Sequence, residues 1–158
     1  MQLKYEKILY CTDFSADADY AFLSALDMAE KYQAHLVLFH VLHSPYKYTR
    51  QVVDEQGEGG EETFVSPDLL DKEKQKLKEQ YGSKMGDFQN YEYQVAVGVP
   101  FVEIVRFARA HNVDFIVLGA SGSSELDKTT FGSTAENVAR RAHCTVMAIR
   151  FPGNIFQL

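Results

Sequence analysis

Short apolar runs alternate with segments of helical spacing along this chain. Residues 7–12, 35–42, 113–118 and 144–150 are predominantly apolar, and residues 91–97 alternate between polar and apolar side chains. Runs of this length are typical of β-strands, and the run 35–42 is nearly continuous, as expected of a strand covered on both faces. Strands that alternate with helices indicate an α/β fold with a parallel sheet.

Capping residues predict where the helices between these strands begin and end. Ser15 suits the N-cap of the first helix, and Asp17 and Asp19 in its first turn favour the helix dipole. The second helix is predicted to begin with Ser66 as its N-cap and Pro67 as its first residue. The third is predicted to begin at Pro100 and to end at the C-terminal cap Asn112, and the fourth to span residues 133–142.

Each of the first three helices carries apolar side chains at helical spacing, which we expect to face the sheet. These inward residues are Ala18, Ala21, Phe22, Ala25, Leu26 and Ala29 in the first helix, Leu70, Leu77, Tyr81 and Met85 in the second, and Phe101, Ile104, Val105 and Ala108 in the third.

The length of 158 residues predicts a single domain, residues 1–158. Residues 44–66 lack a clear period and include an acidic, glycine-rich run at 54–62, so we expect a mobile insertion within that domain. Residues 151–158 form a predicted C-terminal tail.

Charge and cysteine content narrow the function classes. The net charge of −6 argues against general binding to nucleic acid or membrane surfaces, which requires a basic face. The polar start of the chain does not fit a secretory signal, and no apolar run is long enough to span a bilayer. Cys11 and Cys144 are the only cysteines, so we expect reduced thiols and a cytoplasmic location.

Glycines and hydroxyl residues cluster after the fourth predicted strand. Gly119 and Gly122 follow the apolar run, and after nine further residues Gly132, Ser133 and Thr134 open a predicted helix. Glycine permits close backbone approach to an anion, and a helix N-terminus points N–H groups at it. This pattern predicts a phosphate-binding loop.

Four parts of the chain resemble the universal stress protein family, in its ATP-binding branch. The spacing Gly-x2-Gly-x9-Gly-Ser/Thr over residues 119–133 looks like the nucleotide-binding signature of that family. Residues 7–15 are similar to its first strand and turn, residues 34–41 to its second strand, and residues 98–100, Gly-Val-Pro, to the start of its third helix.

The resemblance implies an open, doubly wound parallel sheet of five strands in the order 3-2-1-4-5, with helices on both faces, an adenine nucleotide alpha hydrolase-like fold. In this order the switch point lies between the first and fourth strands, where open α/β sheets bind ligands. Thr12 and Asp13 end one of these strands, and Leu118 and Gly119 end the other.

The resemblance also implies a set of nucleotide-binding residues, with Asp13 on the adenine side and Val41 in apolar contact with the base. The predicted residues are Cys11, Thr12, Asp13, Val41, Leu118, Gly119, Ser121, Gly122, Ser123, Gly132, Ser133 and Thr134.

Several of these residues also have purely structural interpretations, which the sequence leaves open. Asp13 suits an Asx turn before the first helix, and Val41 and Leu118 suit an ordinary core. Ser133 and Glu136 match a capping box, and any single glycine can serve a turn.

The chain departs from the family pattern at two positions. Many members have proline where Cys11 stands and a basic residue where Ser123 stands. Lys128 is the only nearby cation, and it fits an ordinary solvated lysine; Ser121, Ser123 and Ser124 offer hydroxyl donors instead.

Other chemistry has little support. His40 and His43 are three residues apart on an extended run, so their rings face opposite sides and do not suit a metal pair. The chain has no Walker-type, dinucleotide-binding or nucleophile-elbow motif.

The leading hypothesis, which follows the resemblance, is a cytoplasmic stress-response protein that binds ATP, ADP or AMP and acts as a nucleotide-dependent regulatory module, with Mg²⁺ or Mn²⁺ held through the phosphates. One alternative is a slow ATPase or phosphotransferase at the same site, for which we identify no catalytic residue. Another is a nucleotide-free, dimeric interaction scaffold with a vestigial pocket. We expect a homodimer through the apolar edge strand at residues 145–149, because an unprotected apolar edge needs a partner.

Overall fold

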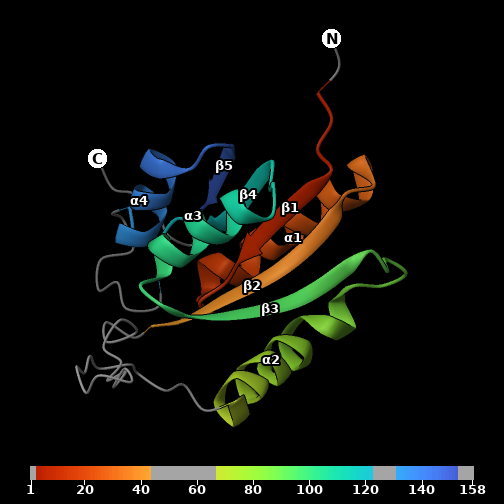
Figure 1. Ribbon diagram of the computed structural model, residues 1–158. Helices are drawn as coiled ribbons and strands as arrows, with labels where there is room; N and C mark the ends of the chain where they lie inside the picture. Colours follow the sequence, from red (N-terminus) through yellow and green to blue (C-terminus); the bar gives the residue numbers. More distant parts are fainter. Residues whose placement is uncertain (1–2, 44–66, 123–130, 153–158) are drawn as a thin grey trace, which may run out of the picture.

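Five parallel strands form the centre of the molecule (Figure 1). The structure is a computed structural model that describes residues 3–43, 67–122 and 131–152. The strand order is β3-β2-β1-β4-β5, which confirms the predicted fold. The strands are β1 (Lys7–Cys11), β2 (His35–His43), β3 (Tyr91–Gly98), β4 (Phe115–Gly119) and β5 (Thr145–Ile149).

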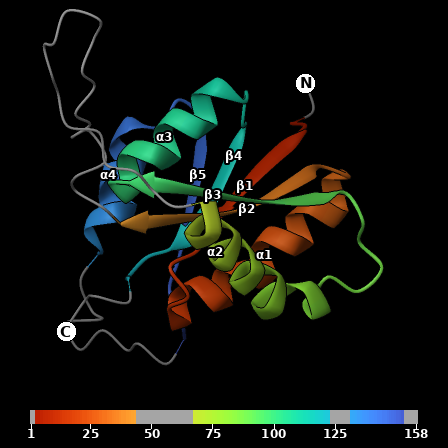
Figure 2. The same ribbon diagram turned by 60° about the horizontal axis from the view of Figure 1, so that its bottom comes forward.

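Helices cover both faces of this sheet, as Figure 2 shows from a second direction. The helices α1 and α2 pack on one face, and α3 and α4 on the other. They are α1 (Ala16–Tyr32), α2 (Pro67–Tyr81), α3 (Pro100–Ala110) and α4 (Ser133–Arg141), with a short 3₁₀ helix, η1 (Gly82–Lys84), after α2. The expected insertion at 44–66, with the predicted cap Ser66, lies outside the described residues, as do residues 153–158 of the tail. Within the described part of the chain, no helix has the length and apolar character needed to cross a membrane.

Local sequence signals account for the helix boundaries. The Ser15 hydroxyl accepts a hydrogen bond from the Ala18 N–H at 3.2 Å and caps α1, as predicted. At the end of α3, Asn112 adopts a left-handed φ of 52°, which is the usual conformation of a residue that terminates a helix.

Two apolar cores lie on the two faces of the sheet. Because side chains of a strand alternate, Tyr10 of β1 points to the face of α1 and α2, while Cys11 points to the face of α3 and α4. Five of the six predicted inward residues of α1 belong to the first core or pack against it, and the sixth, Ala18, is buried at the pocket described below. The prediction for Val105 of α3 was wrong: it is only half-buried and lines a surface groove, while Glu103 of the same helix is buried.

Strand register brings the carboxyl ends of three strands to one edge of the sheet. Cys11 pairs with Phe39 of β2 on one side and with Leu118 of β4 on the other. After β1 the chain continues to β2 and β3, and then it crosses to β4 on the opposite side of β1. The crevice between β1 and β4 is therefore the topological switch point of the sheet.

Candidate functional site

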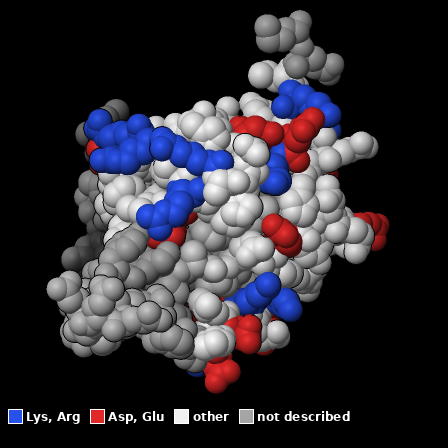
Figure 3. All heavy atoms as spheres, in the orientation of Figure 1, with Lys and Arg blue, Asp and Glu red and all other residues white. Residues whose placement is uncertain are grey.

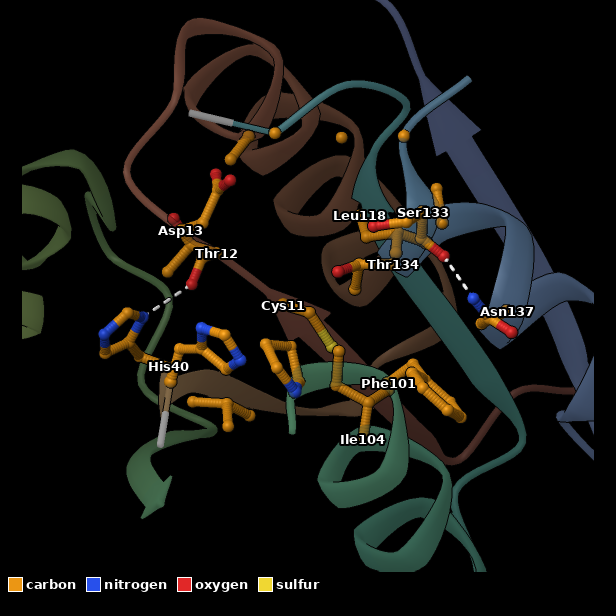
Figure 4. A pocket seen from close by; sticks show the side chains of 18 of the residues that line it. Cys11, Thr12, Asp13, His40, Phe101, Ile104, Leu118, Ser133, Thr134 and Asn137 are labelled. Carbon is orange, nitrogen blue, oxygen red and sulfur yellow. Dashed lines mark hydrogen bonds between the residues drawn. The ribbon is translucent and has the colours of Figure 1, made fainter. Parts of the chain in front are cut away.

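A pocket of about 530 Å³ lies at this switch point (Figure 4). The ends of β1, β2 and β4 form one part of its wall, and the first turns of α3 and α4 form another. Every predicted site residue in the described part of the chain lines this pocket, and Ser123 lies outside the described residues. The predicted residues that line it are Cys11, Thr12, Asp13, Val41, Leu118, Gly119, Ser121, Gly122, Gly132, Ser133 and Thr134.

The wall formed by the strands and α3 is apolar. Val41 and Leu118 lie near the carboxyl ends of β2 and β4, and Ile104 and Phe101 of α3 line the same pocket. Cys11 is buried, and burial raises the pKa of its thiol, so the side chain stays neutral and acts as a small apolar group. This wall suits a flat apolar ring.

Asp13 has a structural role as well as a place on the pocket wall. Its Oδ1 accepts a hydrogen bond from the Ser15 N–H at 3.0 Å, which confirms the Asx turn that the sequence allowed. Its side chain is drawn among the pocket residues in Figure 4. The Asx turn is therefore confirmed, and the contact of Asp13 with an adenine base stays a prediction.

Gly119 is required by the close approach of two protein segments. A Cβ at this position would lie 2.8 Å from the Ala18 nitrogen and 2.9 Å from the Asp17 Cβ. Side-chain atoms do not tolerate such distances, so only glycine lets the end of β4 pack against the first turn of α1. Tight packing on α1 therefore explains Gly119.

Asp17 fixes the start of the loop after β4, a role that the sequence did not reveal. Its side chain is buried, and its two oxygens accept hydrogen bonds from the Ser121 N–H at 3.0 Å and the Phe151 N–H at 2.9 Å. Charge-assisted bonds of this kind hold backbone firmly. The only sequence signal was its position in the first turn of α1.

Gly132 closes the other end of the loop. Its N–H donates to the Ala120 carbonyl at 2.7 Å, and a Cβ here would lie 3.1 Å from the same oxygen. Gly132 is also the N-cap of α4, whose first turn faces the pocket. A helix N-terminus carries a partial positive charge and N–H groups without intrahelical acceptors, which suit an anion.

The capping box that the sequence left open for Ser133 and Glu136 is not formed. Ser133 is the first helical residue rather than the N-cap, and no side chain caps α4. The Glu136 side chain instead pairs with Arg140 at 2.9 Å, on the exposed surface of the helix. Residue spacing matches the motif, but the helix begins one residue earlier than the motif requires, with Gly132 as its N-cap.

His40 is a pocket residue that the sequence analysis considered only as a metal ligand. Its Nδ1 lies 2.8 Å from the Thr12 carbonyl oxygen and therefore carries the hydrogen, because a carbonyl only accepts. Its Nε2 lies 3.5 Å from the Glu73 carboxylate of α2. His40 thus links the end of β1 to α2, and no group of three or more metal-ligating side chains was found among the described residues.

Residues of α3 and part of α4 also line the pocket, although no motif predicted them as site residues. The available signal was Gly-Val-Pro at residues 98–100, which resembles the start of the family's third helix. The additional lining residues near these helices are Val99, Pro100, Phe101, Ile104, Ala135 and Asn137.

Comparison with known proteins identifies the family. The model of the universal stress protein family matches residues 4–150. The chain belongs to the universal stress protein family. The match includes every described segment that lines the pocket.

Individual relatives agree with this assignment. The universal stress protein MJ0531 of Methanocaldococcus jannaschii is 31% identical over 156 residues, which cover 94% of this chain and 84% of the relative. The solved structure of universal stress protein UspA from Lactobacillus plantarum is 26% identical, with a TM-score of 0.70, over 94% of this chain and 100% of that one. A more distant neighbour, a universal stress protein solved in complex with cAMP, is 22% identical with a TM-score of 0.63, over 93% of this chain and 98% of that one.

Proposed function

We propose that the pocket binds an adenine nucleotide, ATP, ADP or AMP, and that the protein acts as a nucleotide-dependent regulatory module. This proposal rests on one observation: an apolar wall and the N-terminus of α4 line the same pocket. Val41, Leu118 and Ile104 form the wall, and the first turn of α4 lies on the other side of the same pocket. A nucleotide has matching halves, since its base is flat and largely apolar and its phosphates are anionic.

Size and a solved neighbour support the same assignment. A volume of about 530 Å³ lies within the usual range for small-molecule sites. A family member of the same fold has been solved in complex with cAMP, which is an adenine nucleotide. We assign the base to the side of Asp13 and Val41, and the phosphates to Ser121, Gly122, Ser133 and Thr134.

The charge of the site favours a divalent ion bound through the phosphates. The described residues that line the pocket include no lysine or arginine. The dipole of α4 balances only about half an elementary charge. Mg²⁺ or Mn²⁺ would supply the missing positive charge while keeping most of its waters, so few protein ligands are needed.

We further propose that the protein is a cytoplasmic homodimer joined along β5. This strand lies at the edge of the sheet, and its side chains from Val146 to Ile149 are only half-buried within the described chain. An apolar edge strand is stabilised by pairing with another strand. Both cysteines are free, in keeping with a reducing compartment.

Calorimetric titration with AMP and CMP tests nucleotide binding, because the two ligands differ only in the base. We expect one AMP per chain, CMP binding at least tenfold weaker, and loss of AMP binding in Gly122→Val without a lower melting temperature. Ser83→Val, at an exposed position of η1, is the matched control and should bind AMP normally. Undiminished AMP binding by Gly122→Val would overturn the site, and equal binding of CMP would overturn its preference for adenine.

A further inference from the structure

A second hollow lies outside the pocket, in a groove between α3 and α4. Its volume is about 610 Å³. Val102, Val105 and Ala110 of α3 give it an apolar floor, and Arg106, Arg109 and Arg141 also line it. In Figure 3 the Lys and Arg side chains gather over this part of the surface.

The groove is locally positive although the chain is acidic overall. The chain has a formal net charge of −6. Arg109 donates a hydrogen bond to the Arg141 carbonyl at 3.2 Å, and neither residue has a carboxylate partner among the described residues. Arg106 pairs with Glu103 at 3.1 Å, but the Glu103 side chain is only 6% exposed, so it lies beneath the surface that a partner would meet.

The arginines are also held in place. The guanidinium of Arg141 lies over the Phe101 ring, 5.2 Å from its centroid, and contacts the Asn137 side chain. Stacking on an aromatic ring and a hydrogen bond restrict this side chain, so less conformational entropy is lost when it binds a carboxylate. Ordered arginines next to apolar side chains are typical of the residues that contribute most to protein interfaces.

We propose that this groove is a docking surface for an acidic segment of a partner protein, whose apolar side chains contact Val102 and Val105 while its carboxylates pair with Arg109 and Arg141. Charge complementarity selects the acidic partner, and the apolar floor selects a peptide rather than a polyanion. A nucleic acid backbone would use the arginines but would leave the valines without a partner, and the acidic remainder of the protein would repel it. The proposal does not depend on what the pocket binds.

Selection from a phage-displayed library of random twelve-residue peptides tests this proposal. The full chain is the bait, and the selected peptides are then measured one by one by fluorescence polarisation. We expect the enriched peptides to combine Asp or Glu with Leu, Ile or Phe. We expect Arg109→Glu/Arg141→Glu to weaken their binding at least tenfold.

Matched variants separate this surface from a general charge effect. Lys72→Glu/Lys78→Glu makes the same change in net charge on exposed positions of α2 and should leave peptide binding within about twofold of the unaltered protein. Val105→Ser keeps the arginines and should weaken binding severalfold, which shows that the apolar floor takes part. Circular dichroism and the melting temperature establish that each variant is folded.

Three results would overturn the proposal. One is the absence of acidic, apolar peptides from the selection. Another is equal peptide binding by Arg109→Glu/Arg141→Glu. The third is binding of a labelled twelve-nucleotide oligothymidine as tight as that of the best peptide, which would identify a surface for polyanions instead. Nucleotide binding in the pocket is measured separately, so failure of either proposal leaves the other unaffected.

Discussion

The two faces of the sheet differ most where β1 ends. On the face of α1 and α2, the rings of Tyr10 and Tyr81 lie 5.4 Å apart and fill the space above the strand. On the face of α3 and α4, the neighbouring residue is Cys11, and the pocket opens beside it. Two consecutive residues of β1, Tyr10 and Cys11, therefore point to a packed face, which we call the filled face, and to a face with a pocket, which we call the open face.

Hydrogen bonding follows the same division. The Tyr81 hydroxyl donates to Asp19 at 2.7 Å and lies 2.7 Å from the Thr12 hydroxyl, so the polar groups of the filled face pair with one another. The open face presents a helix start and apolar side chains instead. The comparison teaches that the small Cys11 leaves space for a pocket on one face, while Tyr10 and Tyr81 fill the opposite face and pair its polar groups.

Gly119→Ala should have the largest effect, because this residue joins the two faces. The added Cβ would lie 2.8 Å from the Ala18 backbone nitrogen, and backbone cannot move aside as a side chain can. We expect the free energy of unfolding to fall by about 3 kcal/mol, measured by urea denaturation. AMP binding should weaken as well, since α1 and the loop after β4 are displaced together.

Gly82→Ala is the matched control for this prediction. Its Cβ would meet only the Tyr93 hydroxyl, at 3.3 Å, so the cost should be below about 1 kcal/mol. Equal destabilisation by the two substitutions would contradict the role assigned to Gly119.

Val41→Phe should affect the open face alone. Val41 lines the pocket, so the larger ring occupies space that we assign to the base. We expect AMP affinity to fall at least tenfold in calorimetric titration, with the melting temperature changed by only a few degrees. Leu23→Phe, on an exposed position of α1, is the control and should bind AMP normally. Normal AMP binding by Val41→Phe would place the nucleotide elsewhere.

Tyr81→Phe should affect the filled face alone. The change removes the hydroxyl that connects Tyr10, Thr12 and Asp19 while it keeps the ring. Loss of buried hydrogen bonds should lower the free energy of unfolding by about 1 to 2 kcal/mol. AMP affinity should change less than threefold, and a larger loss would show that the two faces are not independent.

Alkaline pH should give the smallest effect, and it also acts on the tyrosine face. Burial raises the pKa of Tyr93 to about 12, from the ordinary value of 10, and also raises the pKa values of Tyr10 and Tyr81. A raised pKa means that the folded state disfavours the ionised form of these tyrosines. Their protonated hydroxyls therefore contribute stability to the folded state that is fully present below pH 10 and is lost as the pH rises through the folded pKa. The free energy of unfolding should therefore decline above pH 10, and less steeply in Tyr81→Phe; equal slopes would contradict this assignment.

Most of the fold could be predicted because its signals are local. The run from His35 to Leu42 is apolar enough to indicate a buried strand, and Ser15 and Pro100 mark helix starts by their own chemistry. The strand order came from the resemblance, since periodicity does not specify neighbours. Val105 was misplaced because helical spacing shows that a face is apolar without showing whether that face meets the sheet or a groove.

The pocket residues that belong to a sequence motif could be predicted, whereas the roles of the other pocket residues depend on tertiary contacts. Glycine and serine spacing located the loop that Gly119 and Gly132 begin and end. The role of Asp17 was missed because its carboxylate accepts hydrogen bonds from the N–H groups of Ser121 and Phe151, and both residues are more than a hundred positions away in sequence. His40 was missed because its contact with the Thr12 carbonyl exists only once β1 and β2 are paired.

Backbone amide NMR of the ¹⁵N-labelled protein during titration with AMP tests the central claim most directly. We predict saturable shifts of the Gly119, Ser121, Ser133 and Thr134 amides, with the resonances of Arg109 and Arg141 shifted far less. No shifts at the ends of β4 and the start of α4, or shifts confined to the groove between α3 and α4, would contradict a nucleotide site at the switch point of the sheet.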